Sequence, residues 1–175
     1  MTRRVRLVVV AEDRQTEMFL RRTLYGLGFT GRDLTFKTAP KAMQSADQWV
    51  LQMHGVEAKK LRANAHAQPN TGMVTCIDAD QNTVADRQAQ LDAAMASARK
   101  PNERMAWLVP KQNIETWLRA LGGEPADEAT DYKRRGRDPV PCEAAATAFL
   151  RLQPGQHVSL PSLHAARAEI DRVQP

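Results

Sequence analysis

The sequence alternates short apolar runs with longer amphipathic segments. The first run, Arg6–Ala11, is rich in β-branched residues and predicts a strand buried on both faces. From about Arg14, leucines recur at helical spacing up to Gly28, a natural helix C-cap. Three further apolar runs predict strands at residues 34–36, 73–77 and 105–109. Strands that alternate with helices favour a largely parallel sheet covered by helices.

Capping residues and breaks mark the helices between and after these strands. A helix begins near Ala46, and its pattern is interrupted at Gly55 before it resumes. Thr83 and Asp86 form a T-x-x-D capping pattern at the start of the next helix. Asn113 is a good N-cap for the fourth helix, which two glycines end. Two more helices close the chain.

The 175 residues suit a single α/β domain. We expect a Rossmann-like sheet of about four mostly parallel strands in residues 1–123. Residues 124–175 form a basic segment and C-terminal helices, which we expect to pack on the same domain.

Composition narrows the class of protein. Apolar residues make up 42% and charged residues 26%, as in soluble globular proteins. No stretch approaches the roughly 18 apolar residues of a membrane helix, and the first apolar run is too short for a signal peptide. Cys76 and Cys142 lie far apart, outside any CxxC pattern, which makes a disulfide framework or a zinc site improbable. The cytoplasm is the default location.

Acidic residues follow the predicted strands. Glu12 ends the first strand, and Glu17 lies in the first turn of the next helix. Asp78 and Asp80 follow the third strand, and Glu115 opens the helix after the fourth. Ligands of open α/β sheets bind beyond the carboxyl ends of the strands, so we expect these side chains to surround one cleft.

Clustered carboxylates repel one another unless a cation lies between them, and oxygen ligands favour Mg²⁺ or Mn²⁺. Simpler roles are open for each residue. Glu17 and Glu115 could complement helix N-termini, whereas Asp78 and Asp80 could form a turn. Asp86 is most simply a capping residue. The chain contains no P-loop, G-x-G-x-x-G, G-x-S-x-G or HExxH motif.

The formal charge is +5, which permits binding to a nucleic acid. Basic residues gather at Arg3, Arg4 and Arg6, and again at Lys133, Arg134, Arg135 and Arg137. The second group is our candidate for contacts with nucleic-acid phosphates. A solvated surface is the alternative for both groups.

Three segments resemble the motifs of TOPRIM-fold proteins. VVVAEDRQTEMFLRRTL resembles the first motif, in which a strand ends in glutamate, and CIDAD resembles the later D-x-D. LVPKQNIETWLRAL resembles a stretch of small TOPRIM-like proteins of bacterial defence islands, which are related to nucleases of the overcoming-lysogenization-defect type. Many members have glycine where this chain has Asp13.

The resemblance implies a TOPRIM-like fold and a Mg²⁺- or Mn²⁺-dependent nuclease that acts in antiviral defence. It implies catalytic roles for Glu12, Asp78 and Asp80, and metal ligands at these residues, Glu17 and Glu115. It also implies an ABC-type ATPase partner. We expect DNA as the substrate before RNA.

Two other hypotheses about the function of this chain remain open. The chain could be a non-catalytic TOPRIM-like interaction subunit. It also resembles the start of a receiver domain, with Asp78 as phosphoacceptor and Lys111 as the partner lysine. The first strand lies too far from Asp78 for a compact receiver, however, and the D-x-x-M-P turn is absent.

Overall fold

The computed structural model describes residues 4–133 and 141–174. In these residues four parallel strands form one sheet in the order β2-β1-β3-β4. The strands are β1 (Arg6–Ala11), β2 (Leu34–Thr38), β3 (Thr71–Cys76) and β4 (Met105–Leu108). The α-helices are α1 (Arg14–Gly26), α2 (Ala46–Ala63), α3 (Val84–Ala94), α4 (Ile114–Leu121), α5 (Cys142–Leu150) and α6 (Pro161–Ile170), followed by the 3₁₀ helix η2 (Asp171–Val173). The predicted α/β class and parallel four-stranded sheet are confirmed, and the architecture is compatible with a Rossmann-like fold.

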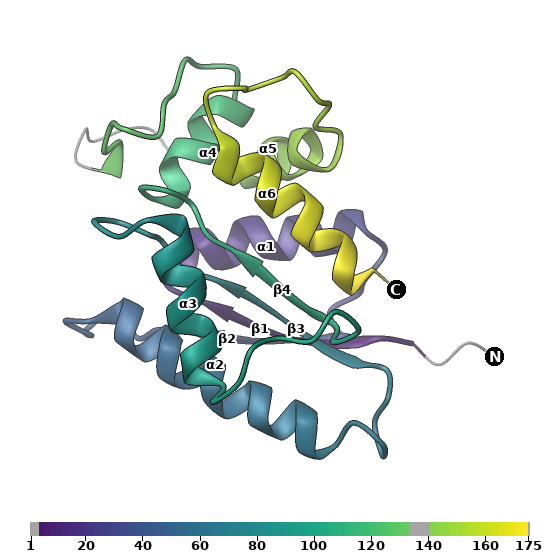
Figure 1. Cartoon of the computed structure of the whole chain (residues 1–175). Helices are drawn as coiled ribbons and strands as arrows, with labels where there is room; N and C mark the ends of the chain where they lie inside the picture. Colours follow the sequence, from purple (N-terminus) through teal and green to yellow (C-terminus); the bar gives the residue numbers. More distant parts are fainter. Residues whose placement is uncertain (1–3, 134–140, 175) are drawn as a thin grey trace.

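The sheet separates two layers of helices (Figure 1). On one face, Leu7, Val9 and Ala11 of β1 share an apolar core with α1, α4, α5 and α6. On the other face, Val10 packs in a second core with α2 and α3. Successive strand residues point to opposite faces, so an almost wholly apolar β1 supplies both cores. The C-terminal helices therefore complete the layer that α1 begins.

Parallel pairing brings the carboxyl ends of the strands to one edge. Ala11, the last residue of β1, is paired with Thr38 of β2 and with Cys76 of β3. Cys76 is in turn paired with Leu108 of β4. The residues that follow β1, β3 and β4 therefore leave the sheet side by side.

Two predicted caps are confirmed. α1 ends just before Gly28, whose φ of +95° is the left-handed conformation that glycine adopts without strain. At the start of α3, Thr83 and Asp86 form the full capping box, with hydrogen bonds of 3.0 and 3.1 Å. Asp86 thus has the structural role expected of it. Asn113 precedes α4, but its side chain makes no capping hydrogen bond, so the prediction of a side-chain cap there is wrong.

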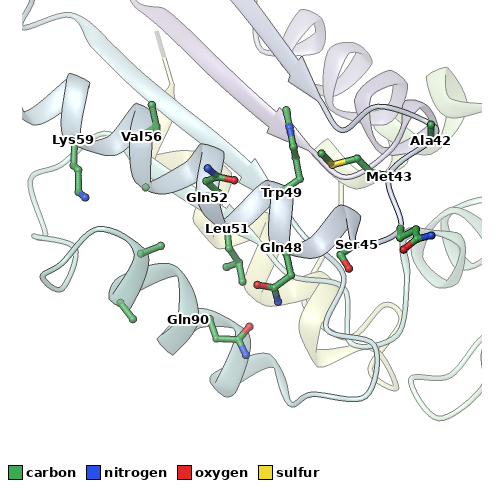
Figure 2. Close-up of a pocket in the computed structure, with 14 residues that line it drawn as sticks. Ala42, Met43, Ser45, Gln48, Trp49, Leu51, Gln52, Val56, Lys59 and Gln90 are labelled. Carbon is green, nitrogen blue, oxygen red and sulfur yellow. The ribbon is translucent and has the colours of Figure 1, made fainter.

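The predicted interruption of α2 at Gly55 is wrong, because the helix runs through it unbroken. Gly55 serves packing instead: a Cβ there would lie 2.5 Å from the carbonyl oxygen of Ala94 in α3. The same two helices border an open groove of about 1090 Å³ (Figure 2). Its lining includes Trp49, Val56 and Gln90. None of the predicted site acids is among the residues that line this groove.

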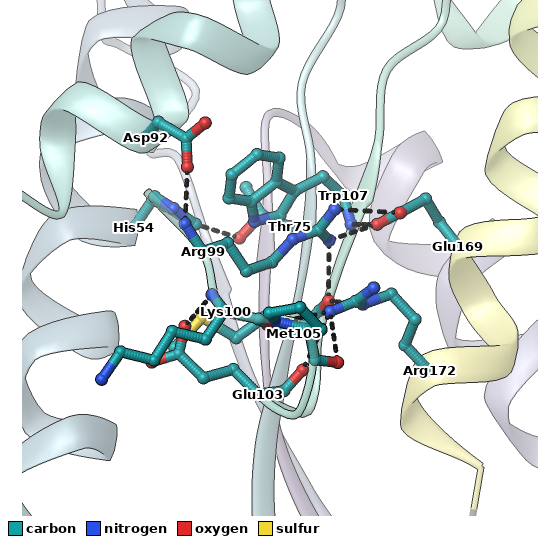
Figure 3. Close-up of polar contacts among 11 residues, drawn as sticks. His54, Thr75, Asp92, Arg99, Lys100, Glu103, Met105, Trp107, Glu169 and Arg172 are labelled. Carbon is teal, nitrogen blue, oxygen red and sulfur yellow. Dashed lines mark hydrogen bonds and ion pairs between the residues drawn. The ribbon is translucent and has the colours of Figure 1, made fainter. Parts of the chain in front are cut away.

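Side chains cover the exposed edge of β4 (Figure 3). Glu169 of α6 accepts a hydrogen bond of 3.0 Å from the Trp107 N–H and pairs with the guanidinium of Arg99. Arg99 and Arg172 donate to the Met105 carbonyl at 2.8 and 3.0 Å. Unpaired strand edges can pair with strands of other chains, and these contacts satisfy the Trp107 N–H and the Met105 carbonyl within the chain.

Among the described residues, no helix combines the length and the apolar character needed to cross a bilayer.

Replacing Gly55 by alanine should lower the free energy of unfolding by about 1–3 kcal/mol, because the new methyl group would press on the Ala94 carbonyl. The higher helix propensity of alanine, about 1 kcal/mol, offsets only part of this cost. Urea unfolding measures the difference. Gly26→Ala is the matched control, since its methyl group would meet only the flexible end of Leu150. A Gly55→Ala protein more stable than wild type would contradict the prediction.

Candidate acidic site

Two acidic residues that follow neighbouring strands meet at the carboxyl edge of the sheet. Glu12 follows β1 directly, and Asp78 lies two residues beyond the end of β3. Oε2 of Glu12 accepts a hydrogen bond of 3.0 Å from the backbone N–H of Asp78. Asp78 is only 2% exposed. The chain thus brings together two acids that are 66 residues apart in sequence.

Burial and mutual repulsion shift both acids in the same direction. Burial raises the pKa of Asp78 well above its ordinary value, and the charge of Glu12 raises it further. Burial also raises the pKa of Glu12, against the lowering effect of the hydrogen bond from Asp78, and the charge of Asp80 adds to the rise. Like charges in a poorly solvated site destabilise the folded protein, and a cation between them would reduce this repulsion.

Asp80 lies at the rim of this pair. Its side chain is exposed, and its charge acts on both Glu12 and Asp78. Its backbone has a φ of +51°, a left-handed conformation that aspartate tolerates better than most residues. The Asp80 N–H donates to the Gln112 carbonyl at 3.2 Å, and Lys111 Nζ donates to the Asp80 carbonyl at 3.3 Å. The loops after β3 and β4 are therefore tied together.

Glu115 joins the same group from the first turn of α4. Burial raises the pKa of Glu115, and its charge in turn acts on Asp78. Its Oε2 is buried and has no hydrogen-bond partner among the described residues. We refer to Glu12, Asp78, Asp80 and Glu115 as the acidic cluster.

Glu17 lies at the same edge, but its side chain is bound by Thr38 and Arg21. Its carboxylate accepts hydrogen bonds of 2.8 Å from Thr38 Oγ1 and 2.8 Å from the Arg21 guanidinium. Burial would raise the pKa of Glu17, but these two hydrogen bonds outweigh it and the pKa is lowered. A metal-binding role for Glu17 stays a prediction and would require the exchange of these partners.

Lys133 is exposed but lies within reach of the charges of the acidic cluster. Desolvation would lower the pKa of Lys133, but the charges of Asp78, Glu115, Asp13 and Glu12 outweigh it and raise the pKa. The other predicted phosphate contacts, Arg134, Arg135 and Arg137, lie outside the described residues. The one described member of the basic group is thus attracted by carboxylates of its own chain.

Sequence reasoning missed Asp13. Its charge contributes to the pKa shifts of Glu12, Glu115 and Lys133. Its Oδ1 also caps α1 by accepting a hydrogen bond of 2.8 Å from the Thr16 N–H. An aspartate directly before a helical stripe is a recognisable N-cap signal, so the cap could have been predicted.

The donors suit Mg²⁺ or Mn²⁺, because all of them are carboxylate oxygens. Within residues 4–133 and 141–174, no group of three or more His, Cys, Asp or Glu side chains is arranged to hold a metal ion. Mg²⁺ commonly takes one or two protein carboxylates and completes its shell with water and substrate phosphate. The metal site therefore stays a prediction, with Glu12 and Asp78 as its candidate pair and the unpartnered Oε2 of Glu115 as a further oxygen.

No protein-family model, curated protein or solved structure matches the chain. Fold and site alone define its class: an α/β protein with a parallel sheet and, at the carboxyl edge, mutually repelling carboxylates of which that of Asp78 is buried.

Asp78→Asn should raise the free energy of unfolding at neutral pH by about 1–2 kcal/mol, because it removes a buried charge. The native pKa of Asp78 lies above its ordinary 3.8, so native wild type binds this proton more readily than the unfolded chain. The free energy of unfolding of wild type should therefore rise relative to that of the variant as pH falls through the raised pKa towards 3.8. Urea unfolding with a chelator, from about pH 8 to about pH 4, measures the difference.

Asp86→Asn is the control, for which we expect a change in the free energy of unfolding of the opposite sign. Hydrogen bonds with Thr83 lower the pKa of Asp86, so this variant should be less stable than wild type at neutral pH. Lower stability of Asp78→Asn at neutral pH would show that the Asp78 charge is well compensated in the native state.

Proposed function

We propose that this protein is a Mg²⁺- or Mn²⁺-dependent nuclease of the TOPRIM type, which hydrolyses phosphodiester bonds. The observation that carries the proposal is the meeting of Glu12 and Asp78, 3.0 Å from carboxylate to amide, at the carboxyl edge of a parallel sheet. Ligands of open α/β sheets bind beyond this edge. The resemblance of the three sequence motifs to TOPRIM proteins supports the same function.

In this proposal Glu12 and Asp78 hold the ion, with Asp80 and Glu115 as further oxygen donors. When bound, the ion supplies Lewis-acid stabilisation of the negative charge on the phosphoryl group. Glu12 is the general acid/base. A raised pKa suits proton transfer nearer neutral pH, and Oε1 is the oxygen that would carry the proton, because Oε2 binds the Asp78 amide.

The proposed substrate is DNA, with RNA as the second choice, because the basic composition suits a polyanion. An ABC-type ATPase partner, a role in antiviral defence and a cytoplasmic location belong to the same proposal. They rest on the family resemblance and on the default for a chain of this composition.

A non-catalytic interaction subunit is the second candidate, and specific observations favour it. Lys133 already supplies a positive charge to the acidic cluster, and the Glu17 carboxylate is bound by Arg21 and Thr38. An acidic group neutralised within its own chain has less need of a metal ion.

Purified protein should cleave plasmid DNA, or tRNA as the second substrate, in Mg²⁺ or Mn²⁺ and not in chelator. Glu12→Gln should slow cleavage about 10²-fold or more, because it removes the general acid/base. Asp78→Asn should also impair cleavage and weaken Mn²⁺ binding. Gel assays measure cleavage and calorimetry measures binding, with Asp86→Asn as the carboxylate control outside the cluster.

Equal cleavage by wild type and Glu12→Gln would assign the activity to a contaminant or to other residues. If wild type fails to cleave, both alone and with a co-encoded ATPase, the interaction subunit becomes the better reading.

Neutralising Arg134, Arg135 and Arg137 together should weaken nucleic-acid binding and its salt dependence. Each lost phosphate contact should reduce the slope of log affinity against log salt by about 0.9 on duplex DNA, or about 0.7 on single strands. Fluorescence anisotropy at several salt concentrations measures both quantities. Lys41→Ala with Lys59→Ala is the control for loss of positive charge elsewhere. An unchanged slope would leave Arg3, Arg4 and Arg6 as the remaining basic candidates.

A further inference from the structure

The amino edge of the sheet, on the side of the molecule marked N in Figure 1, gathers three segments that are far apart in sequence. β1 begins at Arg6, which is paired with Thr71, the first residue of β3. The Arg6 N–H donates to the Asn70 carbonyl at 2.8 Å, and the Met73 N–H donates to the Arg104 carbonyl at 2.9 Å. The residues that precede β1, β3 and β4 therefore form one surface, at the opposite edge from the acidic cluster.

A pocket of about 540 Å³ lies between the loops that precede β3 and β4. Glu103 is the one acid among the described residues that line it, and Arg62, Lys100 and Arg104 are cations of the same lining. The Glu103 carboxylate, shown in Figure 3, accepts hydrogen bonds of 2.6 and 2.9 Å from the Arg62 guanidinium and one of 2.7 Å from the Lys100 N–H. The single acid of the pocket is thus neutralised within the chain.

Lys100 and Arg104 are the cations of this pocket that Glu103 does not use. Lys100 is exposed, whereas Nη1 of Arg104 is buried and has no hydrogen-bond partner among the described residues. Neither residue lies in a helix, so neither complements a helix C-terminus as Arg62 does in the last turn of α2. Burial of a guanidinium nitrogen without an acceptor is costly, and an anion in the pocket would reduce this cost because its charge acts on the whole delocalised cation.

A second pocket, of about 350 Å³, adjoins the first. The two pockets share the lining residues Gln68, Pro69 and Thr71. Arg4 and Arg6 line the second pocket, and no acid is among its described lining residues. Arg4 pairs with Asp33 only at 3.5 Å, and its side chain is still 65% exposed. Cations therefore lie on both sides of the loop that precedes β3.

We propose that this edge of the sheet binds the phosphate backbone of a nucleic acid, with Lys100 and Arg104 in one pocket and Arg4 and Arg6 in the other. We refer to these four residues as the amino-edge surface. Two adjoining basic pockets suit a chain of repeated phosphates better than a single anion, and the guanidinium group matches phosphate geometry. The inference deepens the proposed function and rests on it only for the choice of nucleic acid as the polyanion.

Binding at this surface is separate in space from the acidic cluster. β1 contains six residues and rises about 3.3 Å per residue, so its two ends lie roughly 20 Å apart. A nucleic acid held by Lys100 and Arg104 therefore leaves Glu12 and Asp78 uncovered. Affinity for nucleic acid and chemistry at the acidic cluster should accordingly respond to different substitutions.

Fluorescence anisotropy with a labelled DNA duplex, in chelator and at several salt concentrations, tests the surface. Lys100→Gln with Arg104→Gln should weaken binding about tenfold or more at roughly 0.1 M salt. The slope of log affinity against log salt should fall by about 1.8, because two contacts of about 0.9 each are lost. Lys41→Gln with Lys59→Gln is the matched control, since it removes the same charge from exposed residues outside both pockets.

Two further variants test the surface even if the Arg104 substitution prevents folding. Lys100→Glu changes an exposed side chain and should weaken binding more than Lys59→Glu does. Arg4→Gln with Arg6→Gln, in the second pocket, should reduce the salt slope by a similar amount to the first double variant. Wild-type affinity and slope in folded Lys100→Glu and in the Arg4 and Arg6 variant would overturn the proposal.

Competing ligands identify the occupant. Inorganic phosphate, at the same concentration of phosphate groups as the duplex, should not displace it, because single anions do not span both pockets. Displacement under these conditions would reveal a site for one anion and overturn the polyanion proposal. Binding to phosphatidylserine vesicles without binding to the duplex would also overturn it.

The same measurements separate this surface from the proposed nuclease. Weaker binding by the Lys100 and Arg104 variants, without cleavage by wild type in Mg²⁺ or Mn²⁺, would support the amino-edge surface and reject the nuclease. Cleavage that depends on Glu12, with wild-type affinity and slope in every variant of the amino-edge surface, would support the nuclease and reject the surface.

Discussion

The parallel pairing of β1 with β3 is the constraint on which the rest of the site depends. It aligns Ala11 with Cys76, so the residues after each strand leave the sheet together and Glu12 reaches the Asp78 amide. An antiparallel partner would have sent the two acids to opposite edges. The crossover helices that parallel strands require also supply the apolar layers on both faces.

Holding carboxylates at this edge conflicts with the burial that stabilises the fold. Asp78 is almost fully buried, and its pKa and that of Glu12 are raised because the charged forms are poorly solvated. A fold selected for stability alone would place neutral residues there. The chain offsets the repulsion with a donated amide and with the ammonium of Lys133. A site of this kind favours a cation, either the Lys133 ammonium or a bound metal ion.

The C-terminal part of the chain has two structural roles. Its helices complete the core that α1 and the sheet begin, and Glu169 and Arg172 cover the open edge of β4. The segment before them brings Asp131 and Lys133 back to α4 and to the acidic cluster. Core packing and the charge balance of the site therefore both depend on residues that follow the last strand.

Local patterns in the sequence determined the elements of the fold. The strands, most helix ends, the capping box of Asp86 and the parallel architecture follow from hydrophobic periodicity and turn chemistry, which act between near neighbours. The placement of Glu12, Asp78 and Glu115 at one edge also follows, because parallel strands end together. Only the tertiary structure decided the contacts of Glu17 with Thr38, of Gly55 with Ala94, and of Asn113 with Asp131. These partners lie 18 to 39 residues apart, and the distance between such residues depends on how the elements pack rather than on local preference.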